Sequence, residues 1–183
     1  MKRGRKDQLT GGSHDVNPQT LVSPILAQTG VNTFDLFQLA MPIPRIPSSD
    51  GTQLIIELLK VKYVWNALPA LTTPGINQYY MSVTTNPNKI STIEGNTADP
   101  RQLSDFISVI FSNTADGQLE VPTDFEDNLT DDAGHGILIA TDNLYFLIGS
   151  SGMAGGLRGV VRLLYRFKRV TLIEYVGIVQ SQQ

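Results

Sequence analysis

The chain has 183 residues, of which 41% are hydrophobic and only 17% are charged, a composition that suits one globular domain. It contains no cysteine, which excludes disulfide bonds and thiolate metal sites, and its two histidines offer little for a zinc site or a catalytic triad. No apolar run approaches the roughly 18 residues that a membrane span requires, and none follows the basic N-terminus. We therefore expect no membrane association and no secretory signal peptide.

The formal net charge of -3 hides an uneven distribution of charged residues. Basic residues gather near the two ends of the chain, at Lys2, Arg3, Arg5 and Lys6 and again at Arg158, Arg162, Arg166, Lys168 and Arg169. Residues 102–157 contain no Lys or Arg, but they contain the acids Asp105, Asp116, Glu120, Asp124, Glu126, Asp127, Asp131, Asp132 and Asp142. This segregation predicts surfaces of opposite sign that bind a polyanion or attract another copy of the chain. A solvated acidic loop beside a basic strand is the alternative.

Residues 1–20 are polar, contain glycine and proline, and show no hydrophobic periodicity. They are predicted to form a basic N-terminal arm, and residues 21–183 are predicted to form a single folded domain.

Three strands are predicted in the first half of this domain. Residues 31–43 indicate a strand with one register irregularity, which three closely spaced prolines end because proline cannot donate a ladder hydrogen bond. Residues 51–65 alternate in their second half and are rich in Ile, Val, Tyr and Trp, which favours one long strand. Residues 78–85 predict the third strand on the same grounds, and a decorating surface loop follows at 86–100.

The second half of the chain predicts strands separated by loops. Residues 102–111 fit both helical and alternating spacing, and we favour a strand over a short helix. Residues 116–136 are predicted to form an acidic loop, and residues 137–148 a hairpin around Thr141-Asp142-Asn143. Residues 149–159 contain five glycines and indicate a loop.

The last element, residues 160–179, is rich in Val, Ile, Thr and Tyr and predicts a long strand with a bend or bulge near Arg169. Its aromatic residues Tyr165 and Phe167 alternate with cations, and we expect the aromatic side chains in the core and the cations outside. Seven or eight strand-like runs without a convincing long helix predict an all-β fold, a jelly-roll sandwich of about eight antiparallel strands with long surface loops.

The search for catalytic chemistry identifies no catalytic residue, metal site or cofactor. The glycine-rich run at 149–159 lacks the Gly-Lys-Ser/Thr of a phosphate loop and the βαβ unit of a dinucleotide fold. The acids at 124–132 do not match the spacing of a calcium-binding EF-hand loop. Neither His14 nor His135 has an assignable nucleophile, so the chain is not predicted to be an enzyme.

The two basic groups suggest nucleic-acid binding instead. Arg and Lys neutralise phosphates without reading sequence, and a flexible basic arm can follow an irregular single strand. The predicted nucleic-acid-binding residues are therefore Lys2, Arg3, Arg5, Lys6, Arg158, Arg162, Arg166, Lys168 and Arg169. We also hypothesise that the acidic segment meets Lys60, Lys62 or Lys89 of a neighbouring copy.

Four stretches of sequence resemble the capsid proteins of small circular Rep-encoding single-stranded DNA viruses, the circovirus-like type found in environmental and faecal samples. They are DVNPQTLVSPILAQTGVNTFDLFQLAMPIPR (15–45), QLIIELLKVKYVW (53–65), YYMSVTT (79–85) and YRFKRVTLIEYVGIVQSQQ (165–183). The first and last are the distinctive ones. The arm, with only four cations, is shorter than the long arginine-rich arms of many such proteins.

The resemblance implies a jelly-roll shell domain, self-association of about 60 copies into a small icosahedral virion, and a single-stranded DNA genome inside it. It also implies assembly in the host nucleus, aided by KRGRK at residues 2–6, and a host receptor that no motif identifies. Two other function classes stay open on the residues alone. One is a soluble β-sandwich that binds carbohydrate or protein through the loops at 86–100 and 114–136, and the other is an enzyme with a carboxylate site in the acidic loop.

Overall fold

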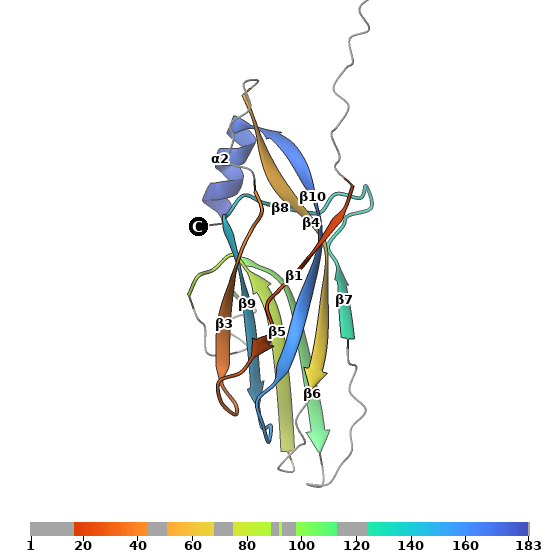
Figure 1. Cartoon of the computed structure of the whole chain (residues 1–183), viewed down its shortest axis with the longest axis vertical. Coiled ribbons are helices and arrows are strands. Elements are labelled where there is room, and N and C mark those ends of the chain that lie inside the picture. Colours follow the sequence, from red (N-terminus) through yellow and green to blue (C-terminus); the bar gives the residue numbers. More distant parts are fainter. Residues whose placement is uncertain are drawn as a thin grey trace, which may run out of the picture.

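The computed structural model describes residues 17–43, 51–67, 75–88, 92, 98–112 and 124–182. They form two β-sheets and one C-terminal helix (Figure 1). The strands in chain order are β1 (Gln19–Val22), β2 (Leu26–Ala27), β3 (Phe34–Ala40), β4 (Thr52–Ala67), β5 (Gly75–Thr84), β6 (Gln102–Ser112), β7 (Asp124–Asn128), β8 (Ile137–Ile139), β9 (Asn143–Ser151) and β10 (Arg158–Thr171). The helix is α2 (Leu172–Ser181).

The two sheets have the strand order of a jelly roll. Sheet A runs β1-β10-β4-β7, with the short β2 paired to β10 and the short β8 paired to β4. Sheet B runs β3-β9-β5-β6, and every recorded pairing in both sheets is antiparallel. The chain passes repeatedly from one sheet to the other, so that strands adjacent in a sheet come from distant parts of the sequence. The predicted all-β jelly-roll sandwich is confirmed.

Alternation along the strands builds the core between the sheets. On β10, Val161, Leu163 and Tyr165 are buried in the main cluster, and Phe167 packs against it. Tyr165 and Phe167 are therefore core residues, as predicted. The long strand predicted at 51–65 is β4, whose buried residues join the same cluster from sheet A, and the ambiguous segment at 102–111 is the strand β6.

Two of the predicted turns and loops are wrong. The acidic segment 116–136 contains a strand, β7, which pairs with β4 from Lys60 to Val64. The segments around Thr141-Asp142-Asn143 do not form a hairpin, because β8 pairs with β4 in sheet A and β9 pairs with β3 and β5 in sheet B. A short polar connection therefore crosses between the two sheets, a choice that local sequence does not determine.

The last predicted element is correct only up to Thr171. There the strand ends and α2 begins, with a capping box in which Thr171 and Glu174 satisfy each other's backbone N–H groups. The register shifts of β10 against β4 lie between Arg158 and Gly159 and between Leu164 and Tyr165, not near Arg169 as predicted. β3 pairs with β9 without the predicted register irregularity. None of the described helices is long and apolar enough to cross a membrane.

Candidate nucleic-acid interface and the Glu57 cluster

The first half of β10 presents its cations on the outer face of sheet A. Arg158 and Arg162 are exposed, whereas Gly159, Val161 and Leu163, on the other side of the strand, are buried. Arg162 stands opposite Lys62 of β4 in the strand register. Among the described residues, neither Arg158 nor Arg162 has an ion-pair partner. These two guanidinium groups are available to a polyanion.

The lysines of β4 are paired with acids of β7 within the same chain. Lys60 Nζ lies 2.7 Å from Glu126 Oε1, and Lys62 Nζ lies 2.6 Å from Asp124 Oδ2. All four side chains are substantially exposed, so each pair contributes about 1 kcal/mol or less to stability. Lys60 and Lys62 therefore pair with the acidic segment of their own chain, whereas the hypothesis was a pairing with the acidic segment of a neighbouring copy. Lys89, the third lysine of that hypothesis, lies outside the described residues.

The second half of β10 uses its cations differently, because they surround a buried carboxylate. The Glu57 side chain on β4 is completely buried, and Arg166 Nε lies 2.5 Å and Lys168 Nζ 3.0 Å from its two oxygens. The Gly136 backbone N–H donates to the same carboxylate at 3.1 Å, and His135 Nδ1 lies 3.8 Å away. Two of the nine predicted nucleic-acid-binding residues thus hold an internal charge.

The local backbone explains how this carboxylate is enclosed. A Cβ atom at Gly136 would lie 2.1 Å from the Leu58 carbonyl oxygen, so only glycine lets the chain approach β4 and donate to Glu57. Burial raises the pKa of the Glu57 carboxyl, but hydrogen bonds from Arg166, Lys168 and Gly136 outweigh it, so the pKa lies below its ordinary value of 4.5. The carboxylate is therefore ionised at neutral pH, and the cluster of one acid with Arg166 and Lys168 keeps an excess positive charge.

Sequence reasoning missed Glu57, although a signal was present. It is the only acid in the otherwise apolar and basic run at 54–65. Because a charge in the middle of a buried strand requires a partner, its position predicts cations on an adjacent strand. The strand that supplies them, β10, pairs with β4 over more than a hundred residues of sequence separation.

The nine predicted residues do not form one compact patch. Lys2, Arg3, Arg5 and Lys6 lie outside the described residues. Arg158 and Arg169 are separated along β10 by about 36 Å at the usual rise per strand residue. Arg169 is exposed, and its Nη1 donates to Thr52 Oγ1 at 3.3 Å. The five cations of β10 are therefore spread along the strand. Arg158 and Arg162 lie in its first half, and Arg166 and Lys168, which contact Glu57, lie in its second half.

Hydrogen bonds between side chains join the two sheets beside β6 and β7. Tyr63 donates its hydroxyl hydrogen to Ser104 Oγ at 2.8 Å, and Ser104 donates to Asp127 at 2.7 Å. Phe106 of β6 stacks on Phe125 of β7, with ring centroids 4.7 Å apart. Asp127 and Phe125, both from the predicted acidic loop, thus hold the sandwich together at this edge.

Comparisons with known proteins support the architecture. No protein-family model and no curated protein matches the sequence. Among solved structures, VP1 of Trichodysplasia spinulosa-associated polyomavirus in complex with 3'-sialyllactose aligns with a TM-score of 0.56 and 12% identity, over 86% of this chain and 98% of that one. The VP1 pentamer of Human Polyomavirus 7 aligns with a TM-score of 0.54 and 10% identity, over 84% and 96%. At these identities the likeness establishes the fold alone, a jelly roll like that of polyomavirus VP1.

Proposed function

We propose that this chain is the capsid protein of a single-stranded DNA virus, which assembles into a small icosahedral shell and packages the genome without reading its sequence. The observation that carries the proposal is the jelly-roll fold, which aligns over most of this chain with VP1 proteins, one of them a pentamer. The resemblance of four sequence stretches to circovirus-like capsid proteins supports the choice of single-stranded DNA. A role in building a shell requires no catalytic residue.

The surface of the sandwich supports self-association. β3 and β6 are the outer strands of sheet B, and outer strands present unpaired backbone groups that neighbouring copies can cover in a closed assembly. Several large apolar side chains are also exposed, including Ile25, Ile76 and Ile173. Symmetric assembly would bury such groups in repeated contacts.

The distribution of cations supports packaging. Arg158 and Arg162 are exposed on sheet A, and the arm carries Lys2, Arg3, Arg5 and Lys6. Phosphate contacts by Arg and Lys give affinity that depends on salt rather than on base sequence. We further propose that the same arm serves nuclear import, so that shells form in the host nucleus.

Electron microscopy of the purified full chain tests the shell, and nuclease treatment of the same material tests packaging. The proposal expects closed particles that protect nucleic acid from nuclease. A monomer at neutral pH and moderate salt would contradict it and favour a soluble β-sandwich that binds carbohydrate or protein.

Deletion of residues 2–6 tests the contribution of the arm. Each phosphate contact on a single strand adds about 0.7 to the slope of log affinity against log salt, so loss of four cations lowers the slope by about 2.8. Filter binding of a single-stranded oligonucleotide at several salt concentrations measures this slope. An unchanged slope would show that the arm contacts no phosphate.

A further inference from the structure

Three cations share one part of the outer face of sheet A. Lys60 and Lys62 of β4 alternate with the buried Val61 and Tyr63, so both point away from the core. Lys62 is directly opposite Arg162 of β10 in the register, which places their Cβ atoms about 5 Å apart. Like charges this close repel each other, so the surface of Lys60, Lys62 and Arg162 favours any anion that lies over it.

Strand β7 provides carboxylates for two of these cations. Glu126 Oε1 lies 2.7 Å from Lys60 Nζ, and Asp124 Oδ2 lies 2.6 Å from Lys62 Nζ. In the register Glu126 is opposite Lys62, on the side away from Arg162. The acids of β7 therefore reach the lysines from one edge of the sheet. On the other side, Arg162 has no ion-pair partner among the described residues.

The exposure of an ion pair decides whether a phosphate can take the place of its acid. The two acids of β7 are 48% and 54% exposed, and pairs of this kind are weak because water screens both charges. The Glu57 side chain is fully buried, and taking Arg166 or Lys168 from it would leave a buried charge without its partner, which costs far more. The lysines of β4 can therefore change partners, whereas the cations around Glu57 cannot.

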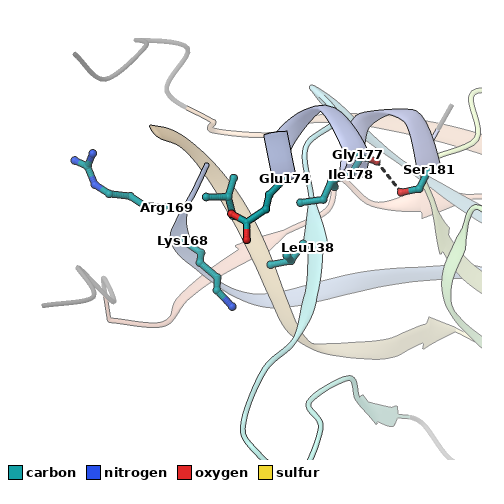
Figure 2. A pocket seen from close by; sticks show the side chains of 8 residues that line it. Leu138, Lys168, Arg169, Glu174, Gly177, Ile178 and Ser181 are labelled. Atoms are coloured by element: carbon teal, nitrogen blue, oxygen red, sulfur yellow. Dashed lines mark hydrogen bonds between the residues drawn. The ribbon is translucent and has the colours of Figure 1, made fainter. Parts of the chain in front are cut away.

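Helix α2 keeps a further acid beside the last cations of β10. Lys168 and Glu174 line the same groove, between the helix and the end of β10 (Figure 2). The Gln182 side chain docks the other end of the helix, because it accepts a hydrogen bond from the Ala140 N–H at 3.1 Å and donates one to the Leu138 carbonyl at 2.6 Å. Glu174 is therefore held in the groove next to Lys168.

The Glu174 carboxylate is ionised at neutral pH. The Thr171 backbone N–H and hydroxyl donate hydrogen bonds to it, and the nearby charge of Lys168 adds to their effect, so the pKa of Glu174 lies below its ordinary value of 4.5. A phosphate that approached Lys168 would meet this carboxylate as well as Glu57. The second half of β10 is thus a poor site for an anion, and the exchangeable cations are those of β4.

We propose that the carboxylates of Asp124 and Glu126 compete with phosphates for Lys62 and Lys60, so that strand β7 limits how tightly the outer face of sheet A holds a nucleic acid. This inference rests on the proposed function, because it concerns the regulation of the same polyanion surface. A strand of nucleic acid bound at Arg162 lies next to Lys62. It gains the two lysines only by displacing the two carboxylates.

Counterion release gives this competition a measurable signature. A lysine that contacts a phosphate displaces condensed cations from the nucleic acid, and each such contact on a single strand adds about 0.7 to the slope of log affinity against log salt. A lysine that first leaves a carboxylate exposes an anion, which attracts a cation from solution and offsets that release. Lys60 and Lys62 therefore add little to the slope while the acids of β7 are present.

Binding of a single-stranded oligonucleotide to the full chain, at several salt concentrations, tests the competition. The variant Asp124→Asn/Glu126→Gln should raise the salt slope by about 1.4, because two lysines then contact phosphates without leaving an anion behind. The same slope tightens binding by about tenfold at about 0.15 M salt. An unchanged slope would overturn the inference.

Asp131→Asn/Asp132→Asn is the matched control. It removes the same charge from the same exposed segment, at two acids that form no ion pair with a lysine among the described residues. The amide oxygen of the Asp131→Asn side chain can still accept the backbone N–H groups of Ala133 and His135. The control should leave the slope unchanged. Equal rises in the two double variants would show a general effect of net charge and overturn the inference.

Replacing the lysines keeps the test decisive if the acid variants fold poorly. In the wild-type background, Lys60→Gln/Lys62→Gln should leave the salt slope nearly unchanged, because the lysines are engaged with the acids. In the background of Asp124→Asn/Glu126→Gln, the same change should remove the whole gain in slope. A fall of about 1.4 already in the wild-type background would show that the lysines contact phosphates without competition. That result would overturn the inference.

The outcomes separate this competition from packaging itself. A wild-type chain that binds the oligonucleotide, with the same slope in every variant, overturns the competition and leaves the capsid proposal standing. A steeper slope in the acid variant of a chain that never forms particles supports the competition and contradicts the capsid proposal. A chain that binds no oligonucleotide at low salt in any of these variants overturns the competition and contradicts packaging.

Discussion

The two halves of β10 carry similar cations but use them in opposite ways. In the first half, Arg158 and Arg162 are exposed on the outer face of sheet A. In the second half, Arg166 and Lys168 are bonded to the buried Glu57 of the neighbouring strand. A row of cations along a strand therefore does not by itself indicate a binding surface. A cation is available to a ligand only where the paired strand has no acid opposite it in the register, as with Arg162 opposite Lys62 and unlike Arg166 opposite Glu57.

The largest expected effect comes from removing the buried charge in the second half. Glu57→Gln leaves Arg166 and Lys168 without their counterion and should lower the free energy of unfolding by about 3 kcal/mol. Urea unfolding monitored by circular dichroism measures it. Glu126→Gln, which breaks the exposed pair with Lys60, is the control and should cost less than about 1 kcal/mol. Similar losses in the two variants would remove the distinction between buried and exposed pairs.

Lowering the pH should weaken the same cluster. The folded pKa of Glu57 is below its ordinary value of 4.5, so the unfolded chain binds the proton first. The stability advantage of wild type over Glu57→Gln is therefore complete above about pH 4.5 and shrinks as the pH falls toward the folded pKa. Unfolding of both proteins from pH 7 to pH 3 measures the difference. A difference that stays constant over this range would show that the Glu57 pKa is not lowered.

The smallest effect on folding is expected in the first half of β10. Replacing both Arg158 and Arg162 by Gln should change the free energy of unfolding by less than about 0.5 kcal/mol, because neither side chain is buried. The salt slope for single-stranded DNA should fall by about 1.4, the contribution of two phosphate contacts. Oligonucleotide binding at several salt concentrations measures the slope. A loss of stability without a change in slope would reverse the proposed roles of the two halves.

Sequence alone predicted the elements whose alternation is visible locally. The second half of β4, from Leu59, and the first part of β10 show period-two patterns, and the buried side chains there are the apolar ones of the pattern. The segment at 124–128 is predicted as a loop because most of its residues are acidic or polar. In the structure two of these acids form ion pairs with Lys60 and Lys62 of β4. The strand β7 is therefore stabilised by tertiary partners that a local pattern does not contain.

The C-terminal helix was missed for a different reason. Its Leu, Ile, Val and Tyr content favours strand by composition, since β-branched and aromatic residues are common in sheets. The spacing of Thr171 and Glu174 was the helix signal, because it is that of a capping box. At the candidate site, the positions of Arg158 and Arg162 follow from alternation, whereas the link from Arg166 to Glu57 depends on which strands pair.

The side-chain amide of Gln182 covers part of the edge of sheet A, and it does so only while helix α2 stays docked. By accepting from Ala140 and donating to Leu138, it imitates a peptide group of one more strand at the border of sheet A. Undocking of α2 would leave the Leu138 carbonyl of β8 and the Ala140 N–H just after that strand without these partners. A chain that opens there would tend to recruit extended segments from other molecules, so docking of the helix also guards against aggregation.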